Sequence, residues 1–277
     1  TVYIYMQPEK LTSTDGQVYT FTTNESDIGV DTSGATSKMA ANTSSLATVT
    51  GTISVDISHL EVVTAAGSPN LTLVAGTTSE LSVRATDANR NIDKDYTGNK
   101  KLVFTGLNSI GTNFPKIENT KFSTVSVPSN ITISFSSGVS ATGAVTLSVF
   151  KKETGSAVAQ ELTKSYSQFG LATTVDAAAA SQIVLLSGDG QAGRTAWPLA
   201  HTFVVAANDT YGNAAGSGTA VDFAISSQPQ GATGTALSTT AALFDANGQA
   251  ATTLTLGSIS GAYQVTASSA GLTGSPV

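Results

Sequence analysis

The chain of 277 residues is acidic and sparsely charged, with a formal net charge of -6 and charged side chains at 12% of positions. This composition offers no basic surface for nucleic acid, and no apolar run reaches the roughly 20 residues that a membrane-spanning helix needs. Because the sequence contains no cysteine, disulfides, thiolate metal sites and a cysteine nucleophile are excluded.

Residues 1–56 are predicted to form an N-terminal β segment, because they are too few for a sandwich of about 100 residues. Thr1–Met6 (TVYIYM) alternates its side chains and predicts a strand. One interpretation makes this strand the tail of a preceding domain in a processed or fragmentary chain. The other makes it a donor strand that fills the open edge of a second subunit, with Val2, Tyr3, Ile4 and Tyr5 as the self-assembly residues.

From residue 57 onward, short runs alternate apolar side chains with threonine or serine, while glycine, asparagine, aspartate and proline separate them. No window keeps a helical apolar pattern over three turns, and only Asp176–Ala180 has a helical composition. The fold class is therefore all-β, with antiparallel sandwiches. The predicted strands include Leu71–Val74, Leu81–Arg84, Leu102–Phe104, Ile131–Phe135, Ala144–Phe150, Ile183–Leu186, His201–Val205, Val221–Ile225, Ala251–Leu256 and Ala262–Ala267.

An internal repeat divides this part of the chain. Ala85–Asn91 (ATDANRN) matches Ala207–Asn213 (ANDTYGN) at an offset of 122 residues, and a Val-Asp pair precedes each copy's first strand. The repeat predicts one sandwich over residues 57–176, with a long insertion, and a second over residues 177–277. Because each closing strand ends at the Val-Asp pair and the next first strand begins within a few residues, the links between the domains are short and predict a stiff rod.

Residues 177–277 resemble bacterial immunoglobulin-like repeats of the invasin/intimin type, and residues 57–176 resemble a more divergent copy. The resemblance implies tandem immunoglobulin-like β-sandwiches in an extracellular or cell-surface protein. Family members usually continue past a Gly-Ser-Pro-Val ending into one more strand, so the second sandwich is expected to lack its last strand. The segments that carry the resemblance are Ala206–Asn213 (AANDTYGN), Phe244–Leu256 (FDANGQAATTLTL), Gly261–Ala267 (GAYQVTA) and Ala270–Val277 (AGLTGSPV).

The loop that begins at Asp87 places oxygen-bearing side chains at every second position, and Asp87, Asn89 and Asp93 are candidate calcium ligands. The loop lacks the central glycine and the distal glutamate of an EF-hand. The same aspartate and asparagine side chains can instead cap their own backbone in a turn. No other cofactor is expected.

The sequence contains no constellation typical of an enzyme. His59 and His201 are expected on strands of different sandwiches, without a second histidine nearby, and no G-x-S-x-G nucleophile turn occurs. The single tryptophan, Trp197, is expected to fill a core, and the alternative is a contact with carbohydrate or with a neighbouring domain.

These observations favour a structural surface protein: a stalk, a filament subunit or an S-layer-type subunit, assembled by strand donation if the N-terminal strand is a donor. Its partners would be copies of itself, in a head-to-tail filament, or neighbouring surface proteins. One alternative is an adhesin or carbohydrate-binding module that uses loops such as 105–130 or 226–242. Another is an accessory region of a larger secreted enzyme.

Overall fold

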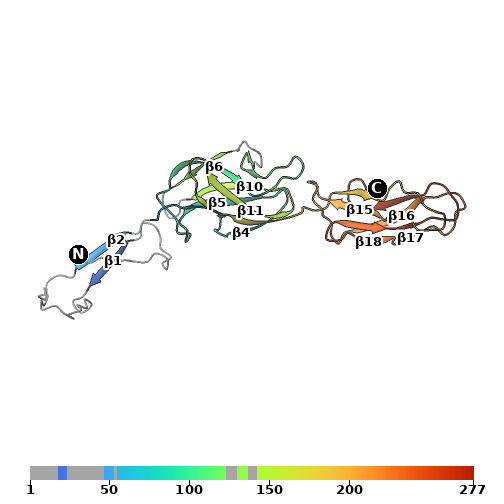
Figure 1. Ribbon diagram of the computed structural model, residues 1–277, viewed down its shortest axis with the longest axis horizontal. Coiled ribbons are helices and arrows are strands. Elements are labelled where there is room, and N and C mark those ends of the chain that lie inside the picture. Colours follow the sequence, from blue (N-terminus) through green and yellow to red (C-terminus); the bar gives the residue numbers. More distant parts are fainter. Residues whose placement is uncertain (1–17, 24–46, 53–54, 123–129, 137–141) are drawn as a thin grey trace.

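The computed structural model describes residues 18–23, 47–52, 55–122, 130–136 and 142–277 (Figure 1). All regular structure in these ranges is β-strand, which confirms the predicted fold class. The described residues include no helix that could cross a membrane. A hairpin of β1 (Val18–Thr23) and β2 (Ala47–Thr52) comes first in the chain, and two β-sandwiches follow it end to end.

The first sandwich packs a six-stranded sheet against a five-stranded sheet. The alternation that predicted the strands decides which side chains lie inside, as in Ile131–Phe135, where every second residue is buried. The six-stranded sheet has the order β12 (Ser167–Phe169), β3 (His59–Thr64), β5 (Thr78–Thr86), β10 (Thr142–Ser148), β7 (Lys116–Ile117) and β8 (Thr120–Lys121). The five-stranded sheet has the order β4 (Asn70–Val74), β13 (Leu171–Asp176), β11 (Glu153–Glu161), β6 (Gly98–Thr105) and β9 (Ile131–Phe135).

Two strand pairs at the edges of these sheets are parallel: β12 with β3, and β13 with β4. The other named pairs of the first sandwich are antiparallel. The expectation of antiparallel sheets therefore holds except at these two pairs, where the last strands of the first sandwich, β12 and β13, lie beside its first strands, β3 and β4. The two pairings join the end of this sandwich to its beginning.

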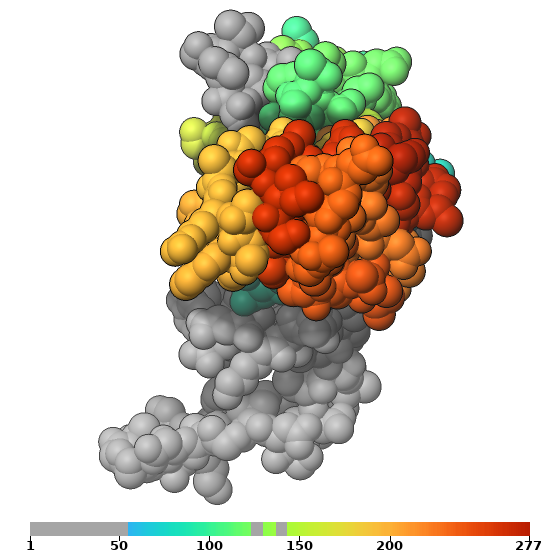
Figure 2. All heavy atoms as spheres, turned by 90° about the vertical axis from the view of Figure 1, so that its right-hand side faces the viewer, coloured from blue at the N-terminus to red at the C-terminus, as the bar shows by residue number. Residues whose placement is uncertain are grey.

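The second sandwich is smaller and is built from three short sheets. Its strands are β14 (Gln182–Ser187), β15 (Phe203–Asn208), β16 (Ala220–Ser227), β17 (Ala236–Leu237), β18 (Ala241–Leu243), β19 (Gln249–Thr252), β20 (Leu254–Thr255) and β21 (Gln264–Ser268). The sheet β14-β15-β19 faces the sheet β18-β16-β21, and β17 pairs with β20. Figure 2 looks along the molecule from the second sandwich, which lies in front of the first.

Each sandwich has its own buried cluster. In the first, a layer of leucines and phenylalanines from both sheets includes Leu60, Leu81, Leu102, Phe104 and Leu147, all at most 3% exposed. The second cluster contains Phe223 and Phe244 together with several alanines. Burial of these apolar side chains is the main stabilising contribution to both sandwiches.

Asp176–Ala180, the one stretch of helical composition, forms no helix. Asp176 ends β13, and Ala177–Ser181 are the five residues that link it to β14. This link connects the sandwiches, and its Ala178 and Ser181 N–H groups donate to Asp209 and Asn208 of the second one.

Candidate functional site: the junction between the sandwiches

Three loops share one turn, which we name by its first residue: the Asp87 corner (residues 87–91), the Asp209 corner (209–213) and the Asp245 corner (245–249). In each, the aspartate Oδ1 atom accepts hydrogen bonds of 2.8–2.9 Å from the backbone N–H groups two and four residues further along. The residue three positions after the aspartate has a positive φ, which is 66° at Arg90, 94° at Gly212 and 70° at Gly248. The repeat seen in the sequence is thus a repeated turn.

Two of the three candidate calcium ligands, Asp87 and Asp93, use their carboxylates to accept hydrogen bonds from the protein itself. The Oδ2 atom of Asp87 accepts a bond of 2.8 Å from the side chain of Asn91. Asp93 accepts bonds from two backbone N–H groups of its own turn and, at 3.1 Å, from the N–H of Ile57. Asn89 is exposed and donates its backbone N–H to Asp87. Within the described ranges no three acidic or histidine side chains gather to hold a metal ion, and calcium binding stays a prediction.

Asp209 is the most deeply buried of the three corner aspartates, with no exposed surface. Its Oδ2 atom accepts hydrogen bonds from the side chain of Asn213 at 2.8 Å and from the backbone N–H of Ala178 at 3.0 Å. Together with the two turn bonds, four N–H groups surround this carboxyl group. Burial of a carboxylate is tolerated when its oxygens are satisfied in this way. Because Ala178 belongs to the link, Asp209 fixes the link to the second sandwich.

Asn213 connects the Asp209 corner to the first sandwich. Its Nδ2 atom donates to the carbonyl oxygen of Phe150 at 2.7 Å, and its Oδ1 atom accepts from the backbone N–H of Lys152 at 2.6 Å. The side chain is buried, with 4% exposure for the residue. Phe150–Lys152 is the turn between β10 and β11, at the end of the first sandwich, so one amide group binds both sides of the junction.

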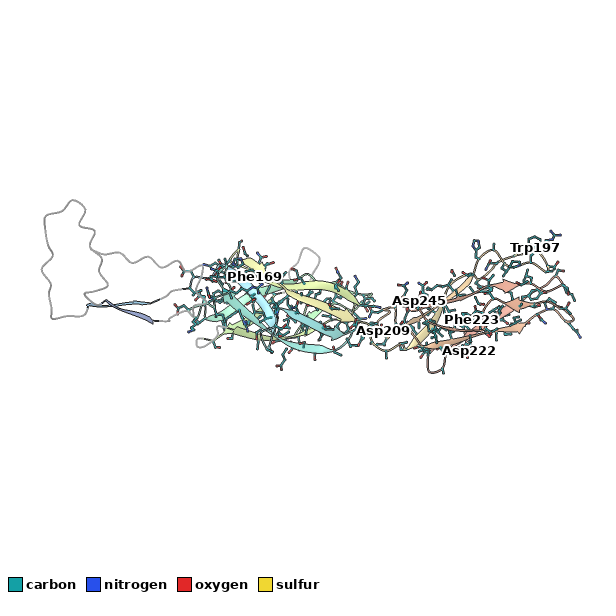
Figure 3. The ribbon with its side chains drawn as sticks, turned by 90° about the horizontal axis from the view of Figure 1, so that it is seen from below. Phe169, Trp197, Asp209, Asp222, Phe223 and Asp245 are labelled. Carbon is teal, nitrogen blue, oxygen red and sulfur yellow. The ribbon has the colours of Figure 1, made fainter. Side chains whose placement is uncertain are left out.

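Tyr211 adds an aromatic contact to the same junction. Its ring meets the ring of Phe150 edge-on, with centroids 5.2 Å apart. The ring also covers Gly76, where any side chain would collide with the tyrosine and the backbone has a φ of 83°. Figure 3 shows Asp209 and Asp245 at the end of the second sandwich that faces the first. The junction therefore combines a buried polar network with ring packing.

The opposite end of the first sandwich carries a different cluster, which the sequence did not point to. Arg90, at the positive-φ position of the Asp87 corner, pairs with the buried Glu61 and lies over the ring of Phe169, 4.1 Å from its centroid. His59 stacks on the other side of that ring at 4.4 Å. Arg84 approaches Glu61 at 3.9 Å. These contacts hold an arginine in a backbone conformation that glycine usually takes.

A groove of about 560 Å³ lies beside β21 in the second sandwich, and its lining includes the apolar side chains of Leu185, Phe203 and Val265 as well as polar ones from Asp189, Gln191 and Gln264. Val277 exchanges two backbone hydrogen bonds with Ala267 of β21, at 2.8 and 2.9 Å. In the first sandwich the corresponding place beside β11 is filled by β13, with alternate residues buried. The groove therefore lies beside β21 at the place that β13 takes beside β11 in the first sandwich.

The remaining candidate residues fall outside the junction. Trp197 is 58% exposed at the far end of the second sandwich, so the expectation of a core position is wrong (Figure 3). Leu199, two residues further on, is buried.

His201 is exposed and precedes β15, and the side chain of Gln191 bonds to its backbone N–H and carbonyl groups. His59 begins β3 as expected. Val2, Tyr3, Ile4 and Tyr5 lie outside the described residues.

Comparison with known proteins finds solved structures whose folds are similar to that of this chain. The D00–D0 domains of intimin match at 14% identity and a TM-score of 0.36, over 79% of this chain and 95% of that one. The Escherichia coli adhesin FdeC matches at 16% identity and a TM-score of 0.36, over 83% and 67%. Domains 5–6 of the S-layer protein SbsC match at 18% identity and a TM-score of 0.25, over 80% and 96%. No family model and no curated protein matches the chain.

Proposed function

We propose that this chain is a rigid spacer in a cell-surface protein, a rod of immunoglobulin-like sandwiches that holds other parts away from the surface. The single observation that carries the proposal is the junction, where Asn213 binds backbone groups of Phe150 and Lys152 while Asp209 holds the link. A flexible connection would need no buried polar network. Here both faces of the junction are satisfied only in one relative orientation.

The rest of the chain supports the same role. The link of five residues is short and is bound to the second sandwich, because Asp209 accepts the N–H of Ala178 and the carbonyl oxygen of Asn208 accepts the N–H of Ser181. The charged fraction of 12% and the alternation of apolar residues with serine and threonine suit a protein that stands in solvent. The resemblance of residues 177–277 to invasin/intimin-type repeats implies the location outside the cell. A stalk, a filament subunit and an S-layer-type subunit are forms of this one mechanical role.

Small-angle X-ray scattering of the full chain tests the rod. We expect the unmodified chain to scatter as one extended particle with a fixed maximum dimension. The double variant Tyr211→Ala/Asn213→Ala removes the ring contact and both Asn213 bonds, so its scattering should show a spread of bend angles. Thr210→Ala changes an exposed residue of the same turn and serves as the control. Identical, flexible scattering from all three proteins would exclude the rigid junction.

A second candidate role, self-assembly by strand addition, is favoured by the groove beside β21. An extended strand with alternate apolar side chains would continue the pairing that Val277 begins with Ala267. Val2, Tyr3, Ile4 and Tyr5 of a second copy are the proposed donors, and head-to-tail donation would build a filament.

Sedimentation velocity over a concentration series tests strand addition. The full chain should form larger species as its concentration rises, and Ile4→Asp, which places a charge on the apolar face of the donor, should remain a monomer. Glu9→Gln lies outside the proposed donor strand and is the control. If the unmodified chain stays monomeric at the highest concentration, the groove is not filled by a second copy.

A further inference from the structure

The first sandwich meets the Asp209 corner through a loop as well as through the turn of residues 150–152. In this loop, residues 107–113, Ile110 and Asn113 exchange two backbone hydrogen bonds of 3.0 and 2.9 Å. Apart from its chain neighbours, the nearest atom to the place where a side chain at Gly212 would begin is the Cδ1 atom of Ile110, at 3.9 Å. The loop therefore lies against the third position after the aspartate of the Asp209 corner.

Glu153 ties this loop to the turn that Asn213 binds. Its carboxylate accepts hydrogen bonds of 2.7 Å from the backbone N–H and from the side-chain amide of Asn108, and the Nζ atom of Lys151 lies 3.5 Å from its Oε2 atom. Glu153 directly follows residues 150–152, to which Asn213 is bonded. The loop and the turn are thus held together as one surface, and a corner that docks has to fit both of them.

Glycine at the third position of the Asp209 corner leaves room for Ile110. A methyl group at Gly212 would make an ordinary contact at 3.9 Å, but a longer side chain would have to displace Ile110 or turn away from it. The turn itself accepts a long side chain at this position, because Arg90 takes it in the Asp87 corner with a φ of 66°. At Gly248 of the Asp245 corner, by contrast, backbone oxygens of its own sandwich lie 2.6 and 2.8 Å from where a side chain would begin.

We propose that this surface selects the corner that docks on it. It accepts a corner with tyrosine and glycine at the second and third positions after the aspartate, and it excludes one with Asn89 and Arg90 there, which is the Asp87 corner. Tyrosine covers Gly76, an asparagine leaves that space open, and an arginine collides with Ile110. A second copy of the first sandwich therefore does not dock at this end, and the order of the sandwiches is fixed. This selection rests on the proposed function, because it requires a rigid junction.

Hydrogen-exchange mass spectrometry of the full chain tests the third position. Gly212→Arg places an arginine against Ile110 and should raise the exchange rate of the Lys152 amide, which donates to Asn213, about tenfold. Adding Ile110→Ala to this variant makes room for the arginine and should restore slow exchange. Gly234→Arg is the control, because Gly234 has a φ of 78° and, apart from its chain neighbours, no described atom lies within 4 Å of its side-chain position.

Tyr211→Asn tests the second position without an arginine at a positive φ, and it should raise exchange at Lys152 by a similar factor. Unchanged fluorescence of Trp197 shows that the second sandwich remains folded, and if Gly212→Arg alters it, Tyr211→Asn decides.

Each position is excluded as a selector if its variant exchanges at Lys152 as slowly as the unmodified chain. Equal acceleration by Gly234→Arg, or no restoration by Ile110→Ala, would overturn the collision with Ile110. If Lys152 exchanges freely in the unmodified chain, the junction is not held and the rod proposal fails instead.

Discussion

The two sandwiches share a turn and a strand plan, but they fill their interiors differently. Among the described residues, the first cluster has twenty-three buried members, mostly leucine, valine, isoleucine and phenylalanine. The second has nine, of which three are the alanines Ala207, Ala250 and Ala267. An alanine core keeps the sheets close but buries little apolar area per residue. The strand plan therefore tolerates very different cores, and the smaller one depends on a few large side chains.

The corners of the two sandwiches share their turn bonds but differ in burial and in the bonds that the Asp209 corner makes at the junction. Asp87 and Asp209 accept the same turn bonds, yet Asp87 is half-buried and Asp209 is fully buried. The turn is a local structure that forms wherever the sequence supplies its aspartate and its positive-φ residue. Burial is added by what packs on it, which at Asp209 is the end of the first sandwich.

The largest expected effect tests the dependence of the second core on its few large side chains. Phe223→Ala removes a ring that is 3% exposed and should lower the free energy of unfolding of the second sandwich by about 3–5 kcal/mol. Urea unfolding followed by the fluorescence of Trp197, which lies in that sandwich, measures it. Leu243→Ala, at a residue 63% exposed, is the control. A loss below about 1 kcal/mol would mean that the alanines carry the core.

A smaller effect sharpens the comparison of the corners. Asp209→Ala leaves buried N–H groups without an acceptor and should destabilise the second sandwich by about 2–3 kcal/mol, while Asp87→Ala should cost only about 1 kcal/mol because water reaches that turn. Urea unfolding of the two variants, with circular dichroism for the first sandwich and Trp197 fluorescence for the second, measures the difference. Equal losses would show that burial by the junction adds nothing to the turn.

The smallest effect concerns a polar pair that belongs only to the first core. Tyr96 donates its hydroxyl to Glu161 at 2.6 Å, and both residues are buried. Burial, together with the bond to Glu161, raises the pKa of Tyr96 well above its ordinary value of 10.0. The neutral phenol is thus favoured in the folded state, so its contribution is complete below pH 10 and is lost as the pH rises further.

Tyr96→Phe should destabilise the first sandwich by about 1–2 kcal/mol at neutral pH and flatten its loss of stability above pH 10. The part due to Tyr166, whose pKa burial also raises, should remain. Urea unfolding between pH 7 and pH 11 measures both features. Trp197 fluorescence should show the second sandwich unchanged, and an alkaline slope as steep as in the unmodified chain would contradict the assignment to Tyr96.

Strand prediction succeeded where alternation was strong and failed where side chains were small. β11 (Glu153–Glu161) was missed, because its inward residues Ala157 and Ala159 give little hydrophobic signal although both are fully buried. Phe203, in the predicted strand His201–Val205, is half-buried and lines the groove beside β21. The exposure of Trp197 could not be predicted, because it is set by a loop. In this loop the carbonyl oxygen of Trp197 accepts the N–H of Leu256, and the ring faces solvent.

By itself, the sequence determined the all-β class, the repeated Asp-Asn turn and the shortness of the links, because alternation, turn chemistry and chain length are local properties. It did not determine that Asn213 and Tyr211 join two sandwiches, whereas the side chain of Asn91 bonds to the aspartate of its own turn. The same turn sequence allows both outcomes. Only the tertiary structure decides between them, because docking depends on which distant backbone groups the packing of whole sheets brings within hydrogen-bond distance.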